Sequence, residues 1–265
     1  MTPSRTRIGT AGWALSSETA AAFPGEGRHI ERYARVLDCA EINSSFHRSH
    51  RIEIYRRWAA QTPPSFRFSV KLPRSITHEG RLRRAREPLR RFLDEAGGLG
   101  DRLAVLLVQL PPSFAFEARP VRRFFDLVAG MFGGSVVCEP RHASWFTPAA
   151  DRALAAARVA RAAADPARWP EASRPGGWLG PDGDGRGAVL YHRWHGAPRV
   201  YWSRYEAEWL RARADELARW PEAAQPWCIF DNTASGAAIA NALELRALLA
   251  QRPPAPPTGA ARRAR

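Results

Sequence analysis

The sequence VVCEPRHASWF spans Val136 to Phe146. Its short apolar run is rich in β-branched residues and leads directly to Glu139 and Arg141, and a helix start is predicted at Thr147. This order indicates a buried strand that carries charged groups at its C-terminal end. Because buried parallel strands hold unpaired charge badly, Glu139 and Arg141 must pair with each other or with a bound group. We therefore predict a functional site at this strand end.

Strand and helix patterns alternate along the rest of the chain. Strands are predicted at 7–13, 39–46, 66–72, 103–110, 136–139, 159–165, 188–195 and 227–233. Helices are predicted at 28–37, 51–61, 88–95, 120–129, after Thr147, at 203–220 and at 236–249. The glycine-rich segment 176–187 predicts that the crossover helix after the sixth strand is reduced to a loop.

Eight strands that alternate with helices predict an α/β fold with a single TIM-type (β/α)8 barrel. A doubly wound open sheet is the alternative. Closure is favoured because nearly every predicted strand, the first and last included, ends in polar or aromatic residues, whereas two edge strands of an open sheet would not aim at one crevice.

Length and composition fit one globular unit. The 265 residues are 45% hydrophobic, and we expect a single barrel domain over residues 1–250 followed by a disordered Pro/Ala/Arg-rich tail at 251–265. The sequence shows neither a membrane-spanning apolar run nor a signal-peptide core, so we expect a cytoplasmic protein. Three cysteines without paired spacing are expected to be buried thiols.

The formal net charge of +14 points to anionic partners, but composition weakens that inference. Thirty-nine of the forty basic residues are arginine, a pattern typical of a GC-rich coding bias. The arginine cluster from Arg81 to Arg91 is interpreted as a solvated helix face, with an anion-binding rim as the alternative. Lys71 is the single lysine, which either survives by chance or sits where a titratable amine is needed.

Polar side chains at the predicted strand ends would converge on the mouth of a barrel. The predicted catalytic residues are Glu139, His195, Lys71 and Asp165. The predicted substrate-binding residues are Arg141, Arg193, Asn43, His78, Trp13 and Asn232. A histidine at a strand end suits acid–base work near neutral pH. Glu41 lies deeper, and we favour a structural ion pair between Glu41 and Arg141 or Arg193.

Cofactor binding has little support in the sequence. Glu139, Asp165 and His195 come from separate strands and supply oxygen and nitrogen donors, but no local metal-ligand spacing accompanies them, and nearby arginines would repel a cation. No metal ligand is assigned, and a divalent metal is not favoured. No nucleotide-cofactor fingerprint, P-loop or nucleophile elbow is present. Cationic side chains at the mouth favour a phosphate or carboxylate instead.

Seven sequence blocks resemble the DUF72 family, also called the YecE-like family. They are GTAGW at 9–13, EINSSFHR at 41–48, FRFSVKLPRSITH at 66–78, LGDRLAVLLVQLPPSF at 99–114, EPRHASWF at 139–146, YHRWHG at 191–196 and IFDNTASGAAIANALEL at 229–245. The resemblance implies a TIM-type barrel and brings no settled activity with it. The family often has asparagine at the position of Asp231.

Two functions are compatible with these features. The preferred interpretation is an enzyme, of hydrolase, lyase or isomerase class, that acts on a small or terminal anionic substrate, or on a phosphodiester. Arg141 and Arg193 would bind the anion, Glu139 or His195 would move a proton, and Lys71 would stabilise charge or form a Schiff base. The alternative is a non-catalytic protein that binds nucleic acid or another anion through Arg81–Arg91 and the basic tail. Membrane association is not predicted, and the oligomeric state is left open.

Overall fold

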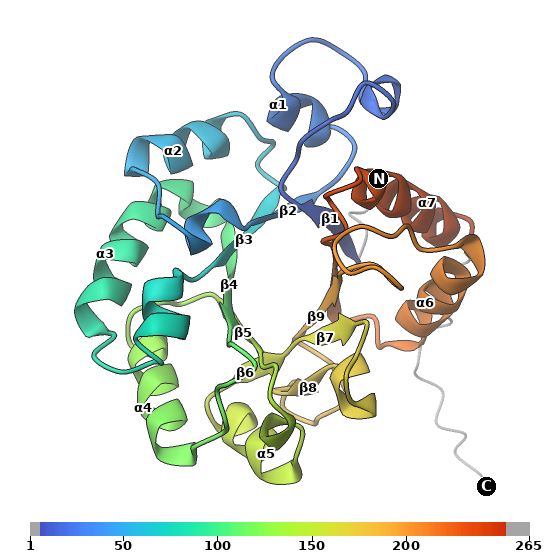
Figure 1. The fold of residues 1–265 in the computed structure, drawn as a ribbon. Helices are drawn as coiled ribbons and strands as arrows, with labels where there is room; N and C mark the ends of the chain where they lie inside the picture. The colour runs from blue at the N-terminus through green and yellow to red at the C-terminus, as the bar shows by residue number, and fades with distance from the viewer. Residues whose placement is uncertain (1–5, 253–265) are drawn as a thin grey trace, which may run out of the picture.

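The computed structural model describes residues 6–252, and most of the predicted tail at 251–265 lies outside this range. Strands form a ring at the centre and helices surround it (Figure 1). The strands are β1 (Arg7–Ala11), β2 (Cys39–Ile42), β3 (Arg67–Lys71), β4 (Leu103–Gln109), β5 (Ser135–Glu139), β6 (Val159–Arg161), β7 (Ala163–Asp165), β8 (Gly176–Gly177), β9 (Val189–Trp194) and β10 (Gln225–Phe230). The α-helices are α1 (His29–Tyr33), α2 (Ile52–Ala60), α3 (Arg86–Ala96), α4 (Ala118–Ala129), α5 (Pro148–Ala156), α6 (Ala207–Arg219) and α7 (Ala237–Ala250).

The predicted TIM-type barrel is confirmed, and the open sheet is excluded by the strand order. The order is β7-β9-β10-β1-β2-β3-β4-β5-β6-β8, with every contact parallel except the short β6–β8 pair. β6 and β7 are two halves of one predicted strand, separated by Ala162. The first half pairs with β5 and the second with β9, so this strand joins the two ends of the sheet.

The crossover after the sixth strand lacks an α-helix, as the glycine-rich loop predicts. A 3-10 turn at Pro170–Ser173 and the two residues of β8 occupy this connection instead. By contrast, the connection after β5 carries α5, whose first turn is built as the sequence indicates. Thr147 Oγ1 accepts a hydrogen bond from the Ala150 amide at 3.3 Å, and Pro148 begins the helix.

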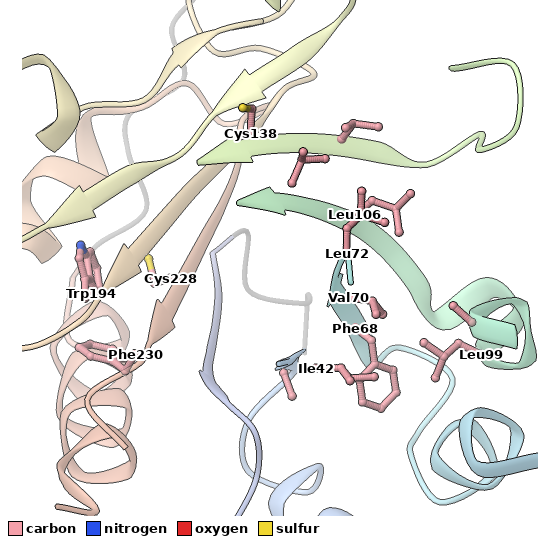
Figure 2. Packing of buried hydrophobic residues seen from close by; sticks show 14 of the residues in the cluster. Ile42, Phe68, Val70, Leu72, Leu99, Leu106, Cys138, Trp194, Cys228 and Phe230 are labelled. Atoms are coloured by element: carbon pink, nitrogen blue, oxygen red, sulfur yellow. The ribbon is translucent and has the colours of Figure 1, made fainter. Parts of the chain in front are cut away.

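Alternate residues of each strand enter two separate cores. Outward-facing side chains pack under the helices; among them Phe68, Val70 and Leu106 lie on neighbouring strands, and Trp194 lies beside Phe230 with ring centroids 4.9 Å apart (Figure 2). Inward-facing apolar side chains form a smaller cluster that includes Leu107, Val137, Tyr191, Trp227 and Ile229. This inner cluster fills the barrel toward the N-terminal ends of the strands. The next inward-facing side chains along the strands are polar, and they lie at the C-terminal end of the barrel.

No helix within residues 6–252 has the length and apolar character needed to cross a membrane.

Candidate functional site

Arg193 of β9 is the centre of a buried ionic cluster at the C-terminal end of the barrel. Its Nε and Nη2 donate to both carboxylate oxygens of Glu41, at 2.9 and 2.7 Å. Its Nη1 donates to Glu139 Oε2 at 2.6 Å, and Nη2 also donates to Asp231 Oδ2 at 2.9 Å. The Arg193 side chain is 1% exposed. Four of its five N–H donors are therefore engaged by three carboxylates.

Glu41 forms one of the two ion pairs predicted for it, with Arg193 as the partner. Glu41 Oε2 also accepts from the Tyr191 hydroxyl at 2.9 Å, and that hydroxyl lies 2.6 Å from Ser69 Oγ. Burial and the neighbouring Glu41 carboxylate raise the pKa of Tyr191 well above its usual range, so it remains a hydrogen-bond donor. These contacts fix the inner side of the cluster.

His195 lies on the outer side of the cluster, between two carboxylates. Its Nδ1 is 3.0 Å from Asp231 Oδ2, and its Nε2 is 3.1 Å from Glu139 Oε1. A neutral imidazole has a single N–H donor, so a doubly protonated ring satisfies both contacts.

The two carboxylates that contact His195 are held ionised. Burial would raise the pKa of Glu139, but Arg193 and Arg141, together with the His195 hydrogen bond, hold it well below its usual range. The same opposition acts on Asp231, where Arg193 and the hydrogen bond from His195 outweigh burial and lower the pKa. Burial by itself would lower the pKa of Arg193. The negative charges of Glu139, Glu41 and Asp231 outweigh this effect and raise the pKa well above its usual range.

Arg141 is the part of the cluster that reaches toward solvent. Its Nη2 donates to Glu139 Oε1 at 3.1 Å, and its side chain is 27% exposed. The Tyr201 hydroxyl lies 3.4 Å from both Nη1 and Nη2 of Arg141. These two contacts are long, and the guanidinium keeps donors for a further acceptor.

Lys71 faces the cluster from the end of β3 and joins no ion pair with another described residue. The ammonium nitrogen lies 4.1 Å from the centroid of the Phe46 ring, and the residue is 9% exposed. Burial, followed by the positive charge of Arg193, lowers the pKa of Lys71 to about 8. His78 packs edge-on against the same Phe46 ring, with the two ring centroids 4.9 Å apart.

Some predicted site residues lie outside the cluster. The Asp165 carboxylate accepts from the Tyr205 hydroxyl at 2.7 Å, and Asn232 donates to the Ser203 carbonyl at 2.9 Å and to Asn241 Oδ1 at 3.0 Å. Trp13 packs edge-on against Trp58 of α2, at 5.0 Å between centroids. Their predicted roles remain predictions, and their positions favour support of the loops and helices around the mouth.

Asn43 occupies an intermediate position. Its Nδ2 donates to Asp231 Oδ1 at 3.4 Å, and its own Oδ1 is buried without a partner among the described residues. A buried amide oxygen without a partner among the described residues can accept a hydrogen bond from a water molecule or a ligand.

Asp231 and Tyr201 contact the cluster and were not among the predicted site residues. Asp231 could have been found, because Trp227 and Ile229 face inward and the next residue in this alternation is 231. Tyr201 has no comparable signal. It lies in the loop after β9 with a φ of 66°, a left-handed conformation that sequence patterns do not indicate for tyrosine.

The cluster is a poor match to a metal centre. Within residues 6–252, no group of three or more His, Cys, Asp or Glu side chains is arranged to hold a metal ion. Glu139, Asp231 and His195 are adjacent, but they bind one another, and the guanidinium of Arg193 occupies the space between the carboxylates. The arrangement is suited to binding a small anion at Arg141 and to moving a proton through His195.

Comparison with known proteins agrees with this architecture. The chain is 33% identical over 118 residues to the UPF0759 protein YecE from two strains of Escherichia coli, a match that spans 44% of the chain and 43% of that relative. A crystal structure of a DUF72 family protein from Enterococcus faecalis superposes with a TM-score of 0.74 at 19% identity, over 93% of this chain and 96% of that one. A DUF72 family protein from Thermotoga maritima gives 0.73 at 22% identity, over 93% and 99%. These two structures show a shared fold.

The family model described as "Protein of unknown function DUF72" matches residues 7–263, which include every strand of the barrel and every residue of the ionic cluster. The chain therefore belongs to the DUF72 family.

Proposed function

We propose that the chain is an enzyme that binds a phosphate or carboxylate group of a small or terminal substrate at the C-terminal mouth of the barrel and transfers a proton there. The observation that carries the proposal is His195, a buried imidazole held between Glu139 and Asp231 beside the exposed end of Arg141. A histidine that needs only to hold the fold has no requirement for two carboxylate partners next to a cation that keeps free donors.

The residues take different roles in this proposal. Arg141 binds the anion, and His195 exchanges a proton with the substrate through Nε2, which leaves its 3.1 Å contact with Glu139 to do so. Glu139 and Asp231 orient the imidazole and stabilise its charged form, because their lowered pKa values make them weak bases. Arg193 positions all three carboxylates, and Lys71 supplies an amine that faces the cluster from the end of β3. Hydrolase, lyase and isomerase reactions all use such a set.

Anion binding is tested with inorganic phosphate as the probe. A ligand that binds the folded state alone stabilises it, by about 1.4 kcal/mol when its concentration is about tenfold above Kd. We expect phosphate to raise the urea unfolding midpoint of the wild type, and Arg141→Gln to abolish the increase. Arg204→Gln is the matched control, because Arg204 is exposed and pairs with Glu244 rather than with the cluster. An equal increase of the midpoint in all three proteins would show that phosphate does not bind at Arg141 in the mouth of the barrel.

Catalysis is tested by an activity screen over phosphate esters and carboxylate substrates, with and without divalent metals. The wild type is compared with His195→Gln and with His47→Gln, which changes an exposed histidine that packs against Phe46. Loss of turnover in the first variant alone supports the assignment. Retained turnover in His195→Gln would remove His195 from the chemistry.

A second candidate function, nucleic-acid binding, is favoured by a specific surface feature. Six exposed arginines follow β3 on the mouth side of the barrel: Arg81, Arg83, Arg84, Arg86, Arg90 and Arg91. Across the mouth, the indole of Trp202 is 45% exposed, with the Arg199 guanidinium 4.5 Å from its ring centroid. Arginines with an exposed aromatic ring suit a single strand, whose bases stack while its phosphates are neutralised.

This candidate makes a separate prediction. Affinity for a single-stranded oligonucleotide should fall steeply with salt, and replacement of Arg83 and Arg84 by glutamine should reduce the salt slope by about 1 to 2. Binding that is weak and unchanged in this variant would exclude the arginine cluster as a nucleic-acid site.

A further inference from the structure

Lys71 differs from the other cations of the site in having no anionic partner among residues 6–252. Arg193 and Arg141 are both ion-paired, at 2.6 to 3.1 Å from carboxylate oxygens. Within residues 6–252, the amine of Lys71 makes neither an ion pair nor a side-chain hydrogen bond, and its contact is the face of the Phe46 ring. A lysine retained for structure would be expected to pair with a carboxylate in so acidic a neighbourhood.

The surroundings of Lys71 also favour a reactive amine. The residue is 9% exposed, and its inward-facing position at the end of β3 places it at the level of Glu41, Glu139 and Asp231. Burial and Arg193 lower the pKa of Lys71 to about 8. At pH 7.4 the neutral fraction of such an amine is about 200-fold larger than that of an ordinary lysine with a pKa of about 10.4.

We propose that Lys71 Nζ forms an imine with the carbonyl carbon of a substrate that also carries a carboxylate or phosphate group. This rests on the proposed function, because Arg141 is the group that holds the anion. It narrows the substrate class to small aldehydes or ketones with an anionic substituent, such as 2-oxo acids or carbonyl phosphates. The neutral amine supplies the nucleophile, and the ammonium form would not react.

The chemistry uses groups that the site already contains. The nitrogen lone pair forms a C–N bond while the carbonyl π electrons move to oxygen, which takes a proton from the imidazolium of His195. The nitrogen then releases one proton to the neutral imidazole. His195 returns that proton to the hydroxyl, which leaves as water while the nitrogen lone pair forms the C=N bond. The amine, the carbonyl compound and one proton therefore give the protonated imine and water. His195 ends neutral and takes up a proton from solvent to return to its starting form.

The test is reductive trapping with sodium cyanoborohydride, followed by mass spectrometry of peptides. Glyoxylate and glycolaldehyde phosphate probe the carboxylate and phosphate classes separately, and propanal is the uncharged control. Because the sequence has one lysine, an adduct on the peptide that contains Lys71 is distinguished at once from one on the α-amino group. Lys71→Arg keeps the positive charge and removes the reactive amine.

We expect one anionic adduct per chain at Lys71, formed about 200-fold faster than on free N-acetyl-lysine at pH 7.4. Its rate should rise with pH up to about 8. Lys71→Arg should lose the adduct, and Arg141→Gln should slow trapping of the anionic probes without slowing that of propanal. Circular dichroism and the urea midpoint establish that both variants are folded.

The failures of the two proposals are distinguishable. If no adduct forms at Lys71 while phosphate still stabilises the protein through Arg141, the imine proposal is wrong and the proposed anion site is unaffected. Equal trapping of propanal and the anionic probes would overturn the substrate class. Loss of the phosphate effect in the wild type would instead overturn the proposed function.

Discussion

The guanidinium of Arg193 and the carboxylate of Glu41 form a two-point ion pair inside the barrel, with N–O distances of 2.9 and 2.7 Å. Both side chains are almost fully buried, at 1% and 0% exposure. The same guanidinium holds Glu139 and Asp231, and these two carboxylates hold His195. The orientation of the candidate catalytic histidine therefore depends on an arginine that does not reach solvent.

Arg193→Met should strongly destabilise the protein. It would leave three buried carboxylates facing one another without their shared cation, and loss of one partner of a buried ion pair costs about 3–5 kcal/mol. Urea unfolding measures the loss. Arg204→Met removes an exposed ion pair with Glu244 and should leave the midpoint nearly unchanged. Similar midpoints for the two variants would mean that the buried network contributes no more than a surface pair.

The cluster should also make the protein sensitive to acid. The folded pKa values of Glu139 and Asp231 are lowered below their unfolded values of about 4.3 and 3.9, so the unfolded state binds protons first. The stability they contribute is fully present above those unfolded values and is lost as the pH falls further. We expect a shallower pH dependence below about pH 4.3 for the double variant Glu139→Gln, Asp231→Asn. Equal slopes would contradict the pKa assignment.

Lys71 should produce the opposite trend at alkaline pH. Its folded pKa of about 8 lies below the unfolded value of about 10.4, so the unfolded state binds more protons between them. The buried charge therefore destabilises the fold below pH 8, and this penalty is relieved as the pH rises toward about 10.4. Relative to Lys71→Met, the wild type should gain stability across this window, by at most about 3 kcal/mol. A constant difference across the window would show that the amine titrates normally.

His78 provides a spectroscopic test of anion binding at the mouth. Burial lowers its pKa, and the positive charges of Lys71, Arg74 and Arg141 lower it further. A phosphate bound at Arg141 adds negative charge nearby, so the pKa of His78 should rise when phosphate is added. Histidine NMR titration measures the change, with chloride at equal ionic strength as the control. An unchanged titration in phosphate would place the anion elsewhere.

The alternation of strand residues predicted much of the candidate site. Alternation places Glu139 and Arg141 on one face of a strand, and the structure pairs them at 3.1 Å. It places Arg193 and His195 on one face of another strand, and both contact Glu139. This success has a local cause, because neighbouring side chains of a strand point to opposite faces in any fold.

Residues near the ends of strands and in loops were harder to place. Asp165 ends β7 and was predicted to join the site, but its carboxylate accepts from Tyr205. Asn232 was predicted to bind substrate, whereas its neighbour Asp231 is the residue that contacts Arg193 and His195. Asp231 continues the inward-facing register of Trp227 and Ile229 and Asn232 does not, so the alternation itself favours Asp231.

The sequence by itself determined the order of strands and helices, the missing crossover helix and the side chains that share a face of each strand. Those properties follow from local backbone geometry and the burial pattern. Only the tertiary structure decided which charges meet. Glu41 and Arg193 are 152 residues apart, and their contact exists because the strand β6–β7 closes the ring and brings the carboxyl ends of all the strands to one opening. Electrostatic pairing at this range depends on distance in space, which the spacing of residues along a chain does not specify.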